Sequence, residues 1–124
     1  MVTEITMDDM VAGLDTPDED IRILMFYGST CGPCKATMPN YESSAKFYLE
    51  KNARIHFFKI NAWEPEEQKM FCMKYLSDAG VPQFKAYYRG EEILNKIGGG
   101  NEETINNFIH SAVDTAFFRF QEKI

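Results

Sequence analysis

Two stretches of nearly continuous apolar residues dominate the hydrophobic pattern of the chain, at residues 21–27 (IRILMFY) and 55–61 (IHFFKIN). A run of this kind is typical of a β-strand that is covered on both faces. Gly28 ends the first run, and Asn61 closes the second. Both stretches are therefore predicted to be central strands of a buried sheet.

Three shorter segments are predicted to complete this sheet, at residues 2–5, 83–89 and 91–97. The last two are joined at Arg89-Gly90, and so short a connection links antiparallel neighbours. The sheet should therefore contain strands of mixed direction.

Four helices are predicted around the sheet, at residues 6–14, 31–52, 65–76 and 102–120. Thr6 gives the first helix a weak cap signal, and Pro65 suits the start of the third. Pro39 is expected to interrupt and kink the second helix. Asn101 can cap the fourth helix, where apolar residues recur every three or four positions. These residues are Ile105, Phe108, Ile109, Ala112, Val113, Ala116 and Phe120.

The predicted order of elements, β-α-β-α-β-α-β-β-α, indicates an α/β fold in which helices flank a central, mixed five-stranded sheet. With 124 residues, 44% of them hydrophobic, the chain has the size and the core of a single domain spanning residues 1–124. Residues 114–124 are interpreted as a C-terminal extension of the last helix. Its residues Phe117, Phe118 and Phe120 are expected either to fold back on the acidic N-terminal segment or to form a dimer or partner contact.

The charge distribution narrows the range of partners. The formal net charge is −6, and residues 1–20 contain seven acidic residues but no Lys or Arg. Because the chain has no basic stripe, it is not expected to bind nucleic acid. It has no apolar stretch of membrane-spanning length and no secretory signal profile at its N-terminus, so we expect a cytoplasmic protein that does not bind membranes.

Candidate chemistry lies in Cys31-Gly32-Pro33-Cys34, directly after a buried strand and at the start of a helix. This context is typical of a redox-active cysteine pair. The unpaired N–H groups of the first helical turn stabilise an anion, so Cys31, expected at the exposed lip of the helix, should ionise more readily than a free thiol. Cys31 would attack a target disulfide as the nucleophile, and Cys34 would resolve the mixed disulfide. This chemistry needs no cofactor.

A metal site is the alternative for this cysteine pair. It would need further ligands, and Cys72, His56 and His110 are the remaining Cys and His residues. None recurs at the short spacing of zinc ligands, and no metal site is predicted. His56 lies in an apolar strand, where a core imidazole with a hydrogen-bond partner is common. Cys72 is interpreted as a small buried apolar residue, with a regulatory thiol as the alternative.

Several motifs together resemble the thioredoxin family over about residues 2–113. They are Cys31-Gly32-Pro33-Cys34-Lys35 with Pro39, Lys59-Ile60-Asn61, Gly80-Val81-Pro82 and Ile97-Gly98. The resemblance implies the thioredoxin fold and the reduction of protein disulfides, with electrons from a thioredoxin-reductase-type donor that is NADPH-linked. It also implies a cis bond at Val81-Pro82 beside the sulfurs, where the backbone pairs with an extended substrate segment. Gly32 and Pro33 would lie in the same substrate-binding surface.

Two positions depart from the family pattern. The family usually has a Trp where this chain has Thr30, and a buried Asp where it has Met25. That Asp is thought to accept the proton of the resolving thiol, and a Lys corresponding to Lys59 lies near it. Lys59 is therefore expected to lack a carboxylate partner and to modulate the pKa of the cysteine pair. A cation near the sulfurs would make the pair less reducing than the roughly −270 mV of thioredoxin. The alternative is that Lys59 extends into water.

Trp63 follows the strand that ends at Asn61 and should emerge at the same sheet edge as the cysteine pair. There it could cover the surface that Thr30 leaves bare and contact the substrate. The alternative is a packing role in a longer loop.

Two other functions stay open at the sequence level. The altered surroundings of the cysteines are compatible with a specialised oxidant or a glutathione-fed reductase. A thioredoxin-fold binding module could instead dock a partner protein through the cysteine face or the phenylalanine-rich C-terminus.

Overall fold

A mixed five-stranded sheet forms the centre of the computed structural model, which describes residues 1–13, 18–51 and 54–122, for 120–122 the backbone only. The strands are β1 (Val2–Glu4), β2 (Ile21–Tyr27), β3 (Ile55–Asn61), β4 (Gln83–Tyr88) and β5 (Glu91–Ile97), in the spatial order β1-β3-β2-β4-β5. Strands β1 and β2 run parallel to β3, whereas β4 is antiparallel to both β2 and β5. The predicted mixed sheet is thereby confirmed.

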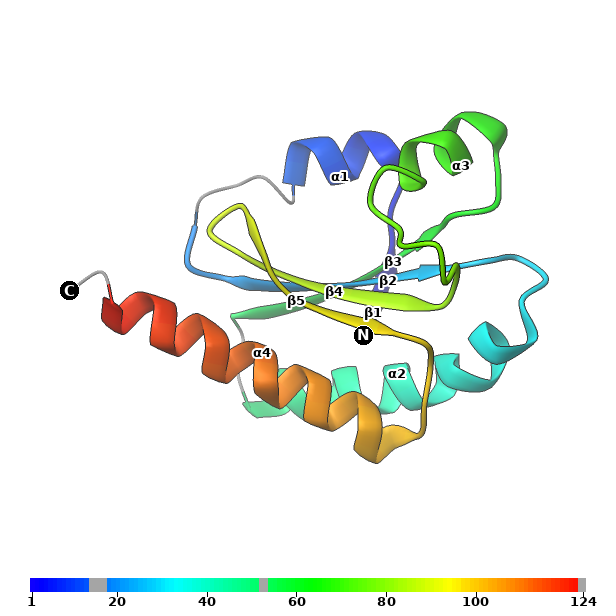
Figure 1. Ribbon diagram of the computed structural model, residues 1–124. Coiled ribbons are helices and arrows are strands. Elements are labelled where there is room, and N and C mark those ends of the chain that lie inside the picture. Colours follow the sequence, from blue (N-terminus) through cyan, green and yellow to red (C-terminus); the bar gives the residue numbers. More distant parts are fainter. Residues whose placement is uncertain (14–17, 52–53, 123–124) are drawn as a thin grey trace.

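Helices cover both faces of the sheet (Figure 1). Helices α1 (Met7–Gly13) and α3 (Glu66–Cys72) lie on one face. Helices α2 (Gly32–Lys51) and α4 (Glu102–Glu122) lie on the other and contact each other. No helix in the described part of the chain combines the length and the apolar character needed to cross a membrane.

The alternation of side chains along β2 divides the core into two layers. Ile23 and Met25 point into the larger cluster beneath α2 and α4, and Leu24 and Phe26 point into the smaller cluster beneath α1 and α3. All four side chains have 0% exposure. A strand buried on both faces needs apolar residues at successive positions, and this requirement explains the continuous apolar run at residues 21–27.

Most predicted elements are confirmed, and the differences lie at their ends and at Pro39 within α2. Strands β2 and β3 have the predicted bounds, while β4 stops at Tyr88 because Arg89 adopts a positive φ of 54° in the turn to β5. Helix α3 ends at Cys72 rather than at residue 76, since the amide of Tyr75 bonds to the carbonyl of Cys72 in a tighter i→i+3 turn. Helix α2 continues across Pro39 without the expected interruption. The predicted end of the first helix at residue 14 lies outside the described residues.

The C-terminal helix is longer than predicted. It continues to Glu122, and Ala116, 4% exposed, still packs in the larger core cluster. Asn101 caps its start, because the Asn101 side-chain oxygen accepts a 2.9 Å hydrogen bond from the amide of Thr104. This capping role was predicted from the sequence.

Candidate functional site

The cysteine pair lies where β2 passes into α2. The chain leaves β2 at Gly28, whose carbonyl accepts a 3.2 Å hydrogen bond from the amide of Cys31, and α2 begins at Gly32. Cys31 and Cys34 are joined by a disulfide, with their Cα atoms 5.2 Å apart. The two cysteines are thus held at bonding distance by the first turn of a long helix.

Burial of the pair is greater than the sequence suggested. Cys31 is only 5% exposed and Cys34 is 1% exposed, so the expectation that Cys31 lies at an exposed lip is wrong for the disulfide form. The carbonyl oxygen of Val81 approaches to 3.9 Å from Cys31 Sγ, and both cysteines belong to the larger core cluster. Cys31 is therefore the more exposed of the two cysteines.

The backbone around Cys31 favours negative charge on its sulfur. The amide of Cys34 donates a 3.2 Å hydrogen bond to Cys31 Sγ. This amide belongs to the first turn of α2, where N–H groups lack partners within the helix and the helix dipole is positive. Once the disulfide is reduced, the same contact stabilises a thiolate at Cys31.

The segment opposite the pair contains the predicted cis proline. The Val81-Pro82 peptide bond is cis, and it follows Gly80, which has a positive φ of 77°. Pro82 is buried, and its carbonyl accepts a 2.9 Å hydrogen bond from the amide of Gly98. A second cis bond at Glu64-Pro65 was not anticipated, because the sequence indicated only that Pro65 could start a helix.

Lys59 has a carboxylate partner, so the expectation that it lacks one is wrong. Its Nζ lies 4.0 Å from an oxygen of Glu4, and the hydroxyl of Tyr27 donates a 2.7 Å hydrogen bond to the same oxygen. The parallel pairing of β1 with β3 sets Glu4 opposite Lys59. Burial and the neighbouring Glu4 raise the pKa of Tyr27 above its ordinary value, so its hydroxyl stays a donor. The less reducing potential expected from an unpaired Lys59 therefore loses its basis.

Trp63 packs directly against the segment that leads to Cys31. Its indole ring lies so close to Gly28 that a Cβ atom at that position would collide with it. Trp63 is 42% exposed, and its amide donates a 2.9 Å hydrogen bond to the Asn61 side chain. The indole therefore lies at the sheet edge where the sequence placed it. Gly28, which the sequence marked only as a strand end, makes this approach possible.

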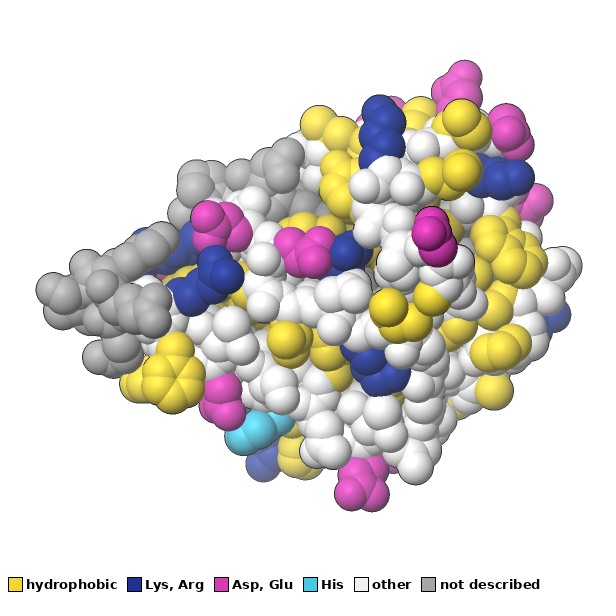
Figure 2. Space-filling view, in the orientation of Figure 1, with side chains coloured by type: hydrophobic (Ala, Val, Ile, Leu, Met, Phe, Trp, Pro, Cys, Tyr) yellow, Lys and Arg dark blue, Asp and Glu magenta, His cyan; other side chains and the backbone are white. Residues whose placement is uncertain are grey.

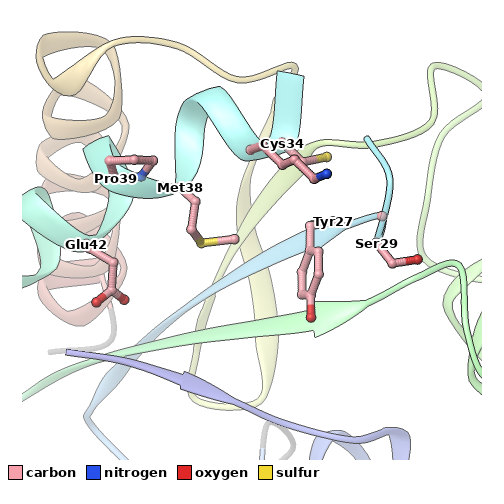
Figure 3. Close-up of a pocket in the computed structure, with 8 residues that line it drawn as sticks. Tyr27, Ser29, Cys34, Met38, Pro39 and Glu42 are labelled. Carbon is pink, nitrogen blue, oxygen red and sulfur yellow. The ribbon is translucent and has the colours of Figure 1, made fainter. Parts of the chain in front are cut away.

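A largely apolar cavity of about 400 Å³ opens beside Cys34, between the end of β2 and α2. Figure 3 shows the Met38 side chain extending from α2 toward the sheet, and the Tyr27 ring at the end of β2 with its hydroxyl directed away from Cys34. Glu42 lies farther along α2, and its carboxylate accepts a 3.1 Å hydrogen bond from the amide of Val2. No sequence pattern predicted this cavity, because its lining combines a strand end with one face of a helix.

The remaining Cys and His residues are separated from the pair. His56 is not a core residue, since its side chain is 40% exposed and its Nε2 lies 2.7 Å from a carboxylate oxygen of Asp20. His110 lies on α4 with 70% side-chain exposure, 3.4 Å from Asp114. Within the described residues, no group of three or more His, Cys, Asp or Glu side chains is arranged to hold a metal ion.

Cys72 is a buried free thiol with 0% exposure, as the sequence interpretation expected. Burial raises its pKa to about 11, so it is protonated at neutral pH. We expect iodoacetamide at pH 7 to alkylate Cys31 in the reduced native protein and to leave Cys72 unmodified. Peptide mass mapping measures this, and alkylation in urea is the control in which Cys72 becomes reactive. Native labelling of Cys72 at the rate of Cys31 would contradict its burial.

Comparison with known proteins decides the family. The family model described as Thioredoxin matches residues 2–111. The chain belongs to the thioredoxin family. The family therefore accounts for nearly all of the chain, from β1 into α4.

Similar proteins include both thioredoxins and disulfide isomerases. Protein disulfide-isomerase A4 of Mus musculus is 29% identical over 89 residues, which are 72% of this chain but 12% of that protein. The chain thus spans about an eighth of the length of the curated relatives it matches first. Thioredoxin of Geodia cydonium is 26% identical over 97 residues, covering 78% of this chain and 84% of that thioredoxin.

A solved structure supports the fold. The short form of thioredoxin f from spinach chloroplast superposes with a TM-score of 0.73 at 23% identity. The match covers 90% of this chain and 92% of the spinach chain. The thioredoxin fold predicted from the sequence is thereby confirmed.

Proposed function

We propose that this thioredoxin domain is a thiol–disulfide oxidoreductase that reduces disulfides in proteins. The observation that carries the proposal is the disulfide-bonded Cys31–Cys34 pair at the start of α2, with the amide of Cys34 donating to Cys31 Sγ. Membership of the thioredoxin family and relatives named thioredoxin and protein disulfide-isomerase support it.

The reaction begins with the reduced pair. The Cys31 thiolate attacks one sulfur of the substrate disulfide, a mixed disulfide forms, and the second substrate sulfur leaves as a thiolate that takes a proton from water. Cys34 then loses its proton, and its thiolate attacks Cys31 Sγ. The Cys31–Cys34 disulfide forms, and the substrate leaves as a dithiol. Two electrons have passed from the domain to the substrate.

Substrate docking is proposed for the surface around the pair. The Val81 carbonyl lies 3.9 Å from Cys31 Sγ, and Pro82 follows it in the chain. Gly32 and Pro33 are exposed at the helix start, and Trp63 lies over Gly28. Figure 2 shows hydrophobic side chains gathered over α3 and near the start of α2. The strongly exposed ones around α3 are Trp63, Met70, Met73 and Tyr75. A surface of this composition suits an apolar polypeptide segment.

Turnover needs an electron source outside the domain, because each cycle leaves the pair oxidised. A thioredoxin-reductase-type donor, NADPH-linked as the family implies, would reduce the disulfide, and the domain itself needs no cofactor. We propose a cytoplasmic location for the protein, where such a reductase would draw its electrons from NADPH. A glutathione-fed or more oxidising redoxin is the alternative within the same chemistry.

The proposal is tested by the reduction of insulin with dithiothreitol. The wild type and the matched control Cys72→Ser should accelerate insulin precipitation equally, while Cys31→Ser should give only the rate of dithiothreitol alone. Should the wild type itself fail to exceed dithiothreitol alone, the domain is instead a binding module with the thioredoxin fold.

A protein contact through the end of α4 is a separate proposal. Phe117 is 58% exposed and Phe118 is 65% exposed, and Phe117 borders a hollow that Glu19 and Tyr88 also line. We expect the double variant Phe117→Ser/Phe118→Ser to sediment as a smaller species than the wild type, with an unchanged insulin rate. Sedimentation velocity measures the association. A wild type that stays monomeric at high concentration would exclude self-association, and a partner would have to be a different protein.

A further inference from the structure

The loop that carries Val81 and Pro82 is fixed to the sheet by one buried side chain, that of Gln83. Gln83 is the first residue of β4 and has 0% exposure. Its side chain lies on the α3 face of the sheet, because its neighbour Phe84 points into the cluster beneath α2 and α4. A primary amide enclosed in this way must find its hydrogen-bond partners within the protein.

All these partners lie in the preceding loop, between α3 and the cis proline. Gln83 Nε2 donates to the carbonyl of Gly80 at 2.7 Å, to Ser77 Oγ at 2.9 Å and to the carbonyl of Ser77 at 3.3 Å. Gln83 Oε1 lies 3.4 Å from the amide of Ser77, from which it accepts a hydrogen bond. One side chain thus holds both ends of the segment 77–80.

This segment determines where Val81 lies. Gly80 directly precedes Val81 and has a positive φ of 77°, and the Val81 carbonyl lies 3.9 Å from Cys31 Sγ. The other side of the loop is fixed separately, by the hydrogen bond from the amide of Gly98 to the carbonyl of Pro82. Of these two attachments, only the one through Gln83 comes from a side chain, so a substitution can remove it and leave the backbone amides in place.

We propose that Gln83 is a positioning residue for substrate docking, which holds the Val81–Pro82 loop at the distance from Cys31 that an extended substrate segment requires. The inference rests on the proposed reduction of protein disulfides and adds a residue to it. Gln83 touches neither sulfur. Its loss should therefore weaken the binding of polypeptide substrates while leaving the exchange chemistry intact.

The test uses Gln83→Met, which keeps the length and the apolar stem but removes every hydrogen bond to the loop. The matched control is Lys85→Met, two residues along the same face of β4. Lys85 is also buried, at 6% exposure, but its partner is Glu92, 2.7 Å away on β5 and not on the loop. Both variants replace the polar end of a buried side chain of β4, so a general loss of stability would affect both. Urea titrations at several temperatures give the free energy of unfolding of each variant. The kinetics are measured at a temperature at which both variants are fully folded without urea.

The pre-reduced proteins are mixed with increasing insulin, or with cystamine, a disulfide too small to pair with the loop. Gln83→Met should raise the half-saturating insulin concentration by about tenfold, which corresponds to the loss of about 1.4 kcal/mol of docking free energy, the scale of a lost hydrogen bond. Its maximal rate with insulin, its rate with cystamine and its reduction potential should match those of Lys85→Met. Equal losses with both substrates, or no change with insulin, would overturn the inference. A wild type inactive on both disulfides would instead refute the proposed function.

Discussion

Replacing Cys34 with serine is expected to stop the reaction at the mixed disulfide. Cys31 would still attack a substrate disulfide, because its sulfur keeps the hydrogen bond from the backbone amide at position 34. The serine hydroxyl cannot displace the substrate from Cys31, since it is a poor nucleophile toward sulfur at neutral pH. The insulin rate should fall to that of dithiothreitol alone.

The trapped species is measured directly. Reduced Cys34→Ser mixed with oxidised insulin should give a covalent adduct in intact-mass spectra and on non-reducing gels, and dithiothreitol should release it. The double variant Cys31→Ser/Cys34→Ser is the control that should form no adduct. If Cys31→Ser traps the substrate and Cys34→Ser does not, the roles of the two cysteines are reversed.

The sequence was sufficient for the elements and for the chemistry that depend on local pattern. The apolar runs at residues 21–27 and 55–61 predicted β2 and β3 with their observed bounds. The cysteine motif directly after β2 predicted a pair at a helix start, since strand, break and helix follow one another in the chain. The Gly80-Val81-Pro82 motif predicted the cis bond through family resemblance alone.

Contacts between distant segments could not be predicted in the same way. Glu4 meets Lys59 only because β1 adds to β3 in one register, and a shift by one residue would point its side chain to the other face. The approach of Trp63 to Gly28 likewise depends on the path of the loop after β3. Burial of Cys31 was underestimated because the Val81 carbonyl that covers it is 50 residues away in the chain.

The contact between Lys59 and Glu4 also determines how a carboxylate at position 25 would affect the stability of the protein. Met25 has 0% exposure and packs in the same cluster as Cys31 and Cys34. It lies beside Lys59 in the register of β2 with β3. Lys59, however, already has a partner in Glu4. A carboxyl group at position 25 would therefore enter an apolar environment in which the neighbouring cation, Lys59, is already paired with Glu4.

We expect Met25→Asp to lower the free energy of unfolding by about 3–5 kcal/mol at pH 7, the range for an uncompensated buried charge. Burial should raise the pKa of the new carboxyl above the unfolded value of about 3.9. Below that unfolded value the group is neutral in both states, and only the lost packing of methionine remains. As the pH rises from about 4 through the folded-state pKa, the destabilisation should grow. Urea unfolding between pH 4 and pH 8 measures it.

Two further variants separate charge from packing and test the competition for Lys59. Met25→Asn, which loses the same packing without a charge, should show a deficit that changes little with pH. Adding Glu4→Gln to Met25→Asp releases Lys59 from its present partner, so the ammonium can turn toward the new carboxylate and restore part of the stability at pH 7. If Met25→Asp alone is as stable as Met25→Asn at pH 7, then Lys59 exchanges Glu4 for the new carboxylate unaided. The Glu4 contact would then be too weak to keep the lysine from the cysteine pair.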